Sequence, residues 1–196
     1  MFEKVQEFEK EIAKFYNAPY AVAVDCCTHG IELCLRYKNI KKCNCYKNTY
    51  LSIPMTLTKL AIDWSWHSKQ EWKDFYYLPD TNIIDAAVYW KKDGYIPKTF
   101  MVLSFQFKKH LSLERGGAIL CETYSDYITL KKMSYDGRLP NVSWEQQDVE
   151  TIGYHYYMTP ETAIMGLEKL PAAIATEATR RNWTTYPDLS KLKVFK

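Results

Sequence analysis

The chain has 196 residues, of which 47% are hydrophobic and 25% are charged, and its formal net charge is +3. This length suits one well-buried domain, and the small, dispersed positive charge argues against nucleic acid as a partner. No apolar run is long enough to cross a bilayer, and the charged N-terminal residues lack a signal-peptide core. We therefore expect a cytoplasmic protein with no membrane contact.

The cysteines indicate a reducing compartment and no metal site. The six of them include no CxxC pair and no histidine at the spacing that zinc sites use. Cys26 and Cys27 are adjacent, and Cys43 and Cys45 are two positions apart, which is too close for ordinary disulfides. We expect reduced, mostly buried thiols.

Residues 2–121 are predicted to alternate helices with short strands. Apolar residues recur every three or four positions in residues 2–15, which is typical of an amphipathic helix. Pro54 suits the first turn of a later helix, and residues 64–77 are aromatic but weakly patterned. The expected helices cover residues 2–15, 29–38 and 54–62, and the expected strands cover residues 20–24, 43–46, 75–78, 81–87, 100–105 and 118–121.

The rest of the chain is predicted to contain helices separated by a turn at residues 136–138 and a polar loop that runs to Ile152. Gly116 and Gly117 should form a tight turn, and a helix with a capping threonine and a first-turn proline should begin at Thr159. Helices are also expected at residues 124–133 and 172–181, the latter leading into a charged tail. Together these elements predict an α/β fold with a mainly parallel sheet between helices, in a single domain of residues 1–196 whose helical tail covers residues 172–196.

A strand, a turn and a helix around residues 20–38 form a candidate anion site. The first backbone N–H groups of a helix are unpaired and lie at the positive end of its dipole, so a phosphate can bind at Thr28 and His29. The alternative is that Thr28 is only an N-cap and His29 only a surface residue.

Three further features are candidates for a ligand site. Asp85 ends a buried apolar run, and ligands bind at the carboxyl edge of open α/β sheets. Tyr50 precedes a helix, where its ring either packs into the core or faces a ligand ring. Lys108 and Lys109 follow an apolar strand, and a desolvated lysine is a nucleophile that can form a Schiff base. The alternative is a solvated turn.

The order of these features resembles the large domain of the DegT/DnrJ/EryC1/StrS family of pyridoxal-phosphate-dependent sugar aminotransferases. The resemblance extends from AVAVDCCTHGIELCL to GYHYYMTPETAIMGLEKL and implies the large domain of the aspartate aminotransferase fold type I. Its most specific part is SFQFKKHLSLERGG, which is similar to the family's Ser-Phe-x-x-x-Lys followed by Gly-Gly. In that pattern the lysine lies five residues after Ser104, so it is Lys109 and not Lys108.

The resemblance implies pyridoxal 5'-phosphate as the cofactor. Lys109 would hold it as a Schiff base and later shuttle a proton between substrate carbons. Asp85 would pair with the pyridine nitrogen and keep it protonated, and Tyr50 would stack on the ring. The phosphate and its surroundings would be contacted by Thr28, His29 and Ser104, and more weakly by Gln106.

The resemblance also implies a homodimer with a shared active site. The segment GYHYYMTPETA is similar to the family's region that enters the cofactor site of the second subunit. His155 and Tyr157 stand there, where the family usually has an amide or a basic residue. They are the candidates for a contribution from the second subunit.

Two departures from the family pattern bear on activity. Val88 stands three residues after Asp85, where the family usually has a histidine or glutamine near the cofactor's phenolic oxygen. Family members also carry a smaller C-terminal domain that helps to close the substrate cleft, and this chain should contain the large domain alone.

Two functions follow from these features. The first is an aminotransferase that moves an amino group from glutamate to a nucleotide-linked keto sugar. The second is a minimal protein of the same fold that binds the cofactor or a partner without transamination. A third alternative, an α/β domain with surface lysines, requires the order of the motifs to be a coincidence.

Overall fold

The computed structural model describes residues 2–69 and 71–196, and it has the expected α/β class. The helices are α1 (Glu3–Tyr16), α2 (Cys27–Tyr37), α3 (Ser52–Lys59), α4 (Tyr124–Ser134) and α5 (Pro160–Ile174). The strands are β1 (Tyr20–Val24), β2 (Lys42–Cys45), β3 (Asp63–Trp66), β4 (Tyr76–Tyr77), β5 (Ile83–Asp85), β6 (Phe100–Ser104) and β7 (Gly117–Cys121). Throughout the described residues, every helix is too short or too polar to span a bilayer.

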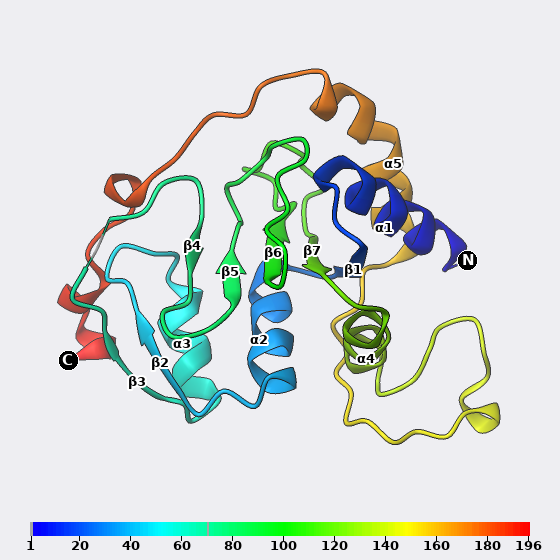
Figure 1. The fold of residues 1–196 in the computed structure, drawn as a ribbon, viewed down its shortest axis with the longest axis horizontal. Coiled ribbons are helices and arrows are strands. Elements are labelled where there is room, and N and C mark those ends of the chain that lie inside the picture. The colour runs from blue at the N-terminus through cyan, green and yellow to red at the C-terminus, as the bar shows by residue number, and fades with distance from the viewer. Residues whose placement is uncertain (1, 70) are drawn as a thin grey trace.

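The main sheet has the strand order β1-β7-β6-β5-β4, and β2 and β3 form a separate pair (Figure 1). Strands β1 and β6 both run antiparallel to β7, and β5 runs parallel to β6. These three strands therefore point the same way and end at the same edge of the sheet. Whatever follows each of them in the chain is brought together at that edge.

The sheet is mixed and not mainly parallel, which corrects the expected pairing. The pairs β6–β7 and β4–β5 are antiparallel, whereas β5–β6 and β2–β3 are parallel. Strands β6 and β7 are consecutive, and so are β4 and β5, and each pair is joined by a loop that reverses the chain. Strands β5 and β6 are also consecutive, but the long irregular connection of residues 86–99 crosses back, so these two run parallel.

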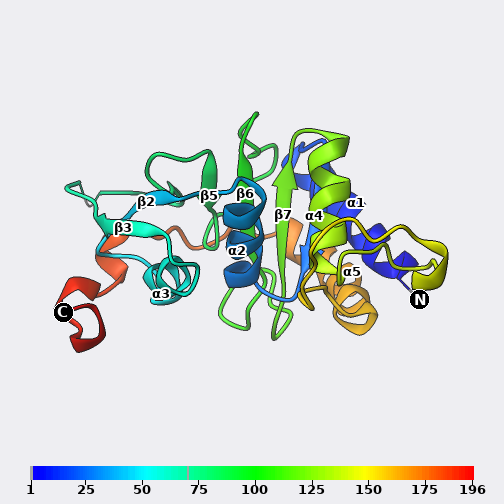
Figure 2. The ribbon, with the colours of Figure 1, turned by 90° about the horizontal axis from the view of Figure 1, so that it is seen from below.

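Helices cover both faces of the main sheet (Figure 2). Alternate residues of a strand point to opposite faces, and β6 follows this rule. Met101 and Leu103 belong to the core that includes residues of α1 and α5, whereas Val102 belongs to the core that includes residues of α2 and α4. The apolar stripe predicted for the first helix lies in the first of these two cores. Both faces of the central strands are thus buried, which holds the strand ends in place.

Local signals fix the starts of α4 and α5, and those of α5 were predicted from the sequence. Thr159 accepts a hydrogen bond from the backbone N–H of Thr162 at 3.3 Å, and Pro160 occupies the first turn of α5. Thr123 and Asp126 form a capping box at the start of α4. These contacts fix where the two helices begin.

The structure differs from the sequence-based elements in three places. Strand β3 (Asp63–Trp66) was not expected, and it exists because it pairs in register with β2, a contact that no local pattern reveals. Gly117 begins β7 and so is not part of a turn. The helix expected over residues 172–181 stops at Ile174, one turn after Pro171, and the following chain is extended or irregular.

Residues 175–196, here called the C-terminal segment, run from α5 across to β2 and β3 (Figure 1). The backbone N–H of Asp74 donates to the Arg181 carbonyl at 2.8 Å, and the N–H of Leu189 donates to the Lys47 carbonyl at 2.9 Å. The ring of Phe195 packs edge-on against Trp66. In place of the expected helical tail, the segment contains three 3₁₀ turns, η2 (Trp183–Thr185), η3 (Leu189–Lys191) and η4 (Lys193–Phe195).

Candidate functional site

A cavity of about 530 Å³ lies at the edge of the main sheet where β1, β5 and β6 end. The start of α2 and the loops after β5 and β6 line it, and so do the residues before α3 and part of the C-terminal segment. We call it the edge cavity. The sequence-predicted site residues that line it are Thr28, Tyr50, Asp85, Ser104, Gln106 and Lys109.

Asp85 is a buried carboxylate at the end of β5. Its side chain accepts hydrogen bonds from the Tyr76 hydroxyl and, at 3.0 Å, from the backbone N–H of Ala87. Burial raises the pKa of Asp85, while the two hydrogen bonds and the charge of Lys109 oppose that rise. The result is a desolvated acceptor, held in place from two sides, that suits a positively charged N–H group.

Tyr76 is a site residue that sequence reasoning missed. It faces Asp85 because the two residues are partners in the antiparallel register of β4 and β5. A strand was predicted near it, but only the register reveals which tyrosine reaches the carboxylate.

The two adjacent lysines have different surroundings. Both line the cavity, but Lys109 is half-buried whereas Lys108 is exposed. Burial lowers the pKa of Lys109, while the neighbouring Cys27 and Asp85 act in the opposite direction. The alternative of a solvated turn therefore applies to Lys108, and Lys109 is the better nucleophile of the pair.

Gln106 shapes the turn that carries these lysines. Its side-chain oxygen accepts the backbone N–H of Lys108 at 3.0 Å, and its backbone carbonyl accepts the N–H of Lys109 at 2.7 Å. Although Gln106 lines the cavity, these contacts already explain its position. Its backbone N–H lies 3.5 Å from the Ser104 hydroxyl, a long contact that leaves that hydroxyl available.

The start of α2 reaches the cavity because a glycine lies beneath it. A Cβ atom added at Gly117 would stand 2.7 Å from the backbone nitrogen of Cys27 and 2.8 Å from the carbonyl oxygen of Leu103. Only glycine permits this approach without a shift of backbone. The second residue of the Gly-Gly pair thus has a packing role at the site.

Thr28 is not the N-cap of α2, so that alternative is wrong. Cys26 occupies the cap, and its Sγ accepts the backbone N–H of His29 at 3.4 Å. The Thr28 hydroxyl lies 2.9 Å from the hydroxyl of Ser52, at the start of α3. Both hydroxyls line the edge cavity, and Ser52 was not singled out in the sequence.

The side chain of His29 does not line the edge cavity. Its Nδ1 lies 2.8 Å from a carboxylate oxygen of Asp25, which also pairs with Arg115 at 2.7 Å. Its ring stacks on Tyr156, with the centroids 3.7 Å apart. Burial acts to lower the pKa of His29, but the hydrogen bonds to Asp25 and Cys26 outweigh it and raise the pKa to about 9.

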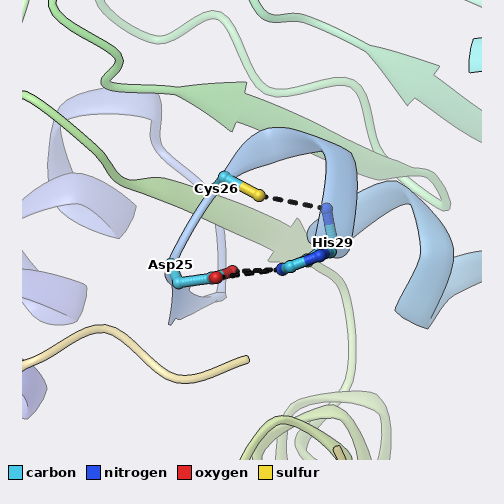
Figure 3. Close-up of side chains that lie close together, drawn as sticks. All are labelled: Asp25, Cys26 and His29. Carbon is cyan, nitrogen blue, oxygen red and sulfur yellow. Dashed lines mark hydrogen bonds and ion pairs between the residues drawn. The ribbon is translucent and has the colours of Figure 1, made fainter. Parts of the chain in front are cut away.

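Asp25, Cys26 and His29 lie close enough together to be considered as metal ligands (Figure 3). Arg115 and the protonated ring of His29 already neutralise the Asp25 carboxylate, and a cation there would meet two positive groups. We therefore assign this cluster as an ion-pair network that fixes the start of α2.

Tyr50 and Val88 both line the edge cavity. Tyr50 is 59% exposed, so the alternative that its ring packs into the core is wrong. The C-terminal segment adds Arg181 and the half-buried Tyr186, whose pKa is raised by burial to about 12. Neither of these two residues belongs to a recognisable motif, and their place depends on how the segment crosses the molecule.

His155 and Tyr157 lie away from the cavity of their own chain. Nδ1 of His155 is 3.1 Å from the Asp136 carboxylate, and the Tyr157 hydroxyl is 3.2 Å from Nε2 of His155. The Tyr157 ring packs against Tyr135. Their contribution to a second subunit stays a prediction.

Several solved structures share this fold. AtS13 from Actinomadura melliaura is 18% identical with a TM-score of 0.75, and the match covers 87% of this chain and 60% of that chain. The PLP form of Spr1654 from Streptococcus pneumoniae, a proposed sugar aminotransferase, is 17% identical with a TM-score of 0.72, covering 88% and 60%. PseC from Helicobacter pylori, an aminotransferase involved in the biosynthesis of pseudoaminic acid, is 13% identical with a TM-score of 0.68, covering 87% and 58%.

At these identities the similarity establishes the fold, which is that of the PLP-dependent aminotransferases. The chain spans about 60% of the length of AtS13 and of Spr1654. No curated protein matches it.

The sequence model of the DegT/DnrJ/EryC1/StrS aminotransferase family matches residues 1–52 and 88–191. These ranges make up most of the chain and include Lys109, Ser104 and the start of α2. Asp85 lies between them, so its assignment rests on its geometry. The resemblance seen in the sequence is confirmed, and the chain belongs to the DegT/DnrJ/EryC1/StrS aminotransferase family.

Proposed function

We propose that this chain binds pyridoxal 5'-phosphate in the edge cavity and transfers an amino group to a sugar. The observation that carries the proposal is the pairing of a half-buried lysine with a buried carboxylate on one cavity, Lys109 with Asp85. These residues fit the cofactor. Asp85 is a desolvated acceptor for a protonated pyridine nitrogen, and Lys109 has a lowered pKa and so a more available amine.

Each of these cavity residues would contact a different part of the cofactor. Lys109 Nζ would bind its aldehyde carbon covalently, and Asp85, fixed by Tyr76, would accept the pyridine N–H. The flat face of Tyr50 would lie against the ring. When bound, the cofactor supplies an electron sink for the substrate carbon that bears the amino group.

The phosphate would lie at the start of α2, near the hydroxyls of Thr28 and Ser104. His29 would act only from outside the cavity, through the positive charge of the network it forms with Asp25 and Arg115, because its ring is held by Asp25 and Tyr156. Gln106 would act by holding the turn that presents Lys109.

For the chemistry itself, Lys109 is the group placed to move a proton. Once the amino donor has displaced it, the free amine of Lys109 would take the proton from the donor carbon that carries nitrogen. Its lowered pKa favours the neutral form that this role requires. Glutamate as the donor and a nucleotide-linked keto sugar as the acceptor are the substrates we propose, on the basis of the family.

We also propose that the protein works as a cytoplasmic homodimer. The basis is the family resemblance: His155 and Tyr157 lie outside the cavity of their own chain, so a role at a cofactor site would be at that of a second subunit. A solution mass of one chain at micromolar concentration would contradict the dimer.

The alternative of a cofactor-binding protein without transamination rests on Val88, which lines the cavity three residues after Asp85. Asp85 favours the aminotransferase, because a carboxylate that would keep the pyridine nitrogen protonated serves the electron sink of amino transfer, which binding of the cofactor alone does not need.

An absorbance spectrum with added pyridoxal phosphate tests the proposal. We expect a visible band in the wild type and in Lys108→Ala, none in Lys109→Ala, and loss of the band when glutamate is added. Lys108→Ala is a matched control, since it removes the neighbouring lysine of the same turn. A band that persists in Lys109→Ala contradicts the role of Lys109, and a band that ignores glutamate contradicts amino transfer.

A further inference from the structure

Residues 175–188 of the C-terminal segment, here called the strap, pass from the end of α5 to Leu189 along the wall of the edge cavity (Figure 1). Apart from the 3₁₀ turn η2, the strap is irregular chain, and its Arg181 and Tyr186 line the cavity. We infer that the strap is a gate, which opens at the ion pair of Arg180 with Asp74 and so controls the entry of small molecules into the edge cavity. The inference concerns access to the cavity and is independent of the reaction that takes place there.

Little of the protein packs beneath the strap. A second cavity, of about 320 Å³, adjoins the edge cavity and is lined by Arg181 and two other residues of the strap. A groove of about 460 Å³ is lined by residues 176–180. Among residues 175–196, all of which the structure describes, only Leu189 is buried. Segments with so few buried side chains open at a low cost in free energy while the core stays folded.

The middle of the strap is tied to a loop. The carbonyl of Arg181 accepts the backbone N–H of Asp74 at 2.8 Å, and the N–H of Trp183 donates to the carbonyl of Trp72 at 3.2 Å. Both partners belong to residues 71–75, which precede β4. Because these two hydrogen bonds join the same two stretches of chain, they should break together when the strap lifts.

Both ends of the strap are fixed. Before it, the carbonyl of Ala173 accepts Nε1–H of Trp90 at 3.1 Å and lies 2.8 Å from Nε2 of His110. After it, Leu189 is buried, and its backbone N–H donates to the Lys47 carbonyl at 2.9 Å. The strap can therefore move between two fixed points without displacing the sheet or α5.

One ion pair holds the strap in its closed position. Nε of Arg180 donates to the Asp74 carboxylate at 3.1 Å, and a terminal nitrogen of the same guanidinium also pairs with it. Asp74 is buried, whereas the side chain of Arg180 is 69% exposed. Arg180 can thus leave into solvent at no cost to the core. Its departure leaves a buried carboxylate without its partner, and this penalty favours closure.

The chain carries its own reporters of opening, since Cys26 and Cys27 line the edge cavity and the other four cysteines are buried. The test measures the rate at which these two thiols react with 4,4'-dithiodipyridine, an uncharged aromatic disulfide. We expect about fivefold or more faster reaction in Arg180→Gln than in the wild type, and an intermediate rate in Arg180→Lys.

Lys193→Gln is the charge-matched control for the thiol test. Lys193 is an exposed cation of the same C-terminal segment, but it lies beyond Leu189 and so outside the strap. Its substitution should change the rate less than twofold. Mass spectrometry of the labelled peptides identifies which cysteines have reacted.

Hydrogen exchange on the wild type tests the gate without any substitution. The N–H groups of Asp74 and Trp183 should exchange at similar rates, about a hundredfold or more faster than the N–H of Ala86. Ala86 is the reference because its N–H bonds to the Val102 carbonyl of β6 at 2.9 Å. Protection of Asp74 and Trp183 equal to that of Ala86 would mean that the strap opens only when the protein unfolds, and would overturn the inference.

Two outcomes of the thiol test would also overturn it. One is an equal rate in the wild type and in Arg180→Gln. The other is labelling of the four buried cysteines as fast as Cys26 and Cys27, since the whole domain would then be opening. Uptake of pyridoxal phosphate is a separate result. A wild type that takes up none contradicts the proposed function, while the thiol and exchange rates still decide whether the strap is a gate.

Discussion

The edge of the main sheet and the C-terminal segment meet at the same cavity, but they are built in different ways. The sheet edge holds Asp85 at the end of β5 and Lys109 on the turn after β6, and both faces of these strands are buried. The C-terminal segment holds Arg181 and Tyr186 on irregular chain that depends on hydrogen bonds to distant backbone. A strand end and a short turn next to the sheet thus present Asp85 and Lys109, whereas the irregular segment adds residues to the cavity with no strand beneath them.

This comparison predicts that substitutions at the sheet edge lower the rate of amino transfer most. Asp85→Asn keeps the size of the side chain but removes the charge that would hold a pyridine nitrogen protonated. We expect amino transfer from glutamate to fall by about a hundredfold or more, as when a preorganised electrostatic partner is removed. Single-turnover absorbance measures this rate.

Tyr76→Phe is the companion variant, since it removes only the hydrogen bond that positions Asp85. Its expected loss is smaller than that of Asp85→Asn. Equal rates for Asp85→Asn and the wild type would show that the carboxylate has no part in the reaction.

The second-largest expected effect comes from Gly117, whose packing lets the start of α2 reach the sheet edge. Gly117→Val places a side chain where a Cβ alone would already meet the backbone of Cys27 at 2.7 Å. We expect the free energy of unfolding to fall by about 1–3 kcal/mol, with weaker cofactor uptake. Urea denaturation measures the free energy of unfolding.

Gly116→Ala is its control, because a Cβ there meets the flexible Cε of Met158 at 3.2 Å and not backbone. That variant should lose clearly less stability. A Gly117→Val protein as stable as Gly116→Ala would mean that the start of α2 is free to shift.

The smallest effect comes from the ion-pair network of His29, Asp25 and Arg115. The folded-state pKa of His29, about 9, exceeds its ordinary value of 6.5, so this stabilisation is fully present below pH 6.5 and is lost as the pH rises to 9. Because the pair is partly exposed, we expect a contribution of about 1 kcal/mol. Unfolding of the wild type and His29→Gln, followed from pH 6 to pH 9.5, measures it.

The wild type should lose more stability than His29→Gln across that range. Parallel curves for the two proteins would mean that the His29 charge does not contribute to stability.

The difference between the sheet edge and the C-terminal segment also explains which site residues could be predicted from the sequence. Strands β1, β5 and β6 have local apolar patterns, and Asp85, Ser104 and Lys109 were predicted from their positions relative to those strands and from a short motif. The edge cavity could therefore be outlined without a structure. The pairing direction within the sheet could not, since it depends on which strands become neighbours.

What the sequence did not predict depends on long-range contacts. Strand β3 requires its partner β2, and Tyr76 requires the register of β4 with β5. His29 has the residue type and position of a phosphate ligand, but Asp25 and Tyr156 turn its ring elsewhere. Arg181 lies in a stretch that was expected to be helical, and only the path of the C-terminal segment brings it to Lys109.

The central claim is that Lys109 is the residue that binds pyridoxal phosphate. The most direct test is to incubate the protein with the cofactor, reduce the link with borohydride, digest the protein and locate the added group by fragment-ion mass spectrometry. We predict that the group is found on Lys109, in amounts that approach one per chain, and not on the adjacent Lys108. A group on Lys108, or one spread over several surface lysines, would contradict the claim.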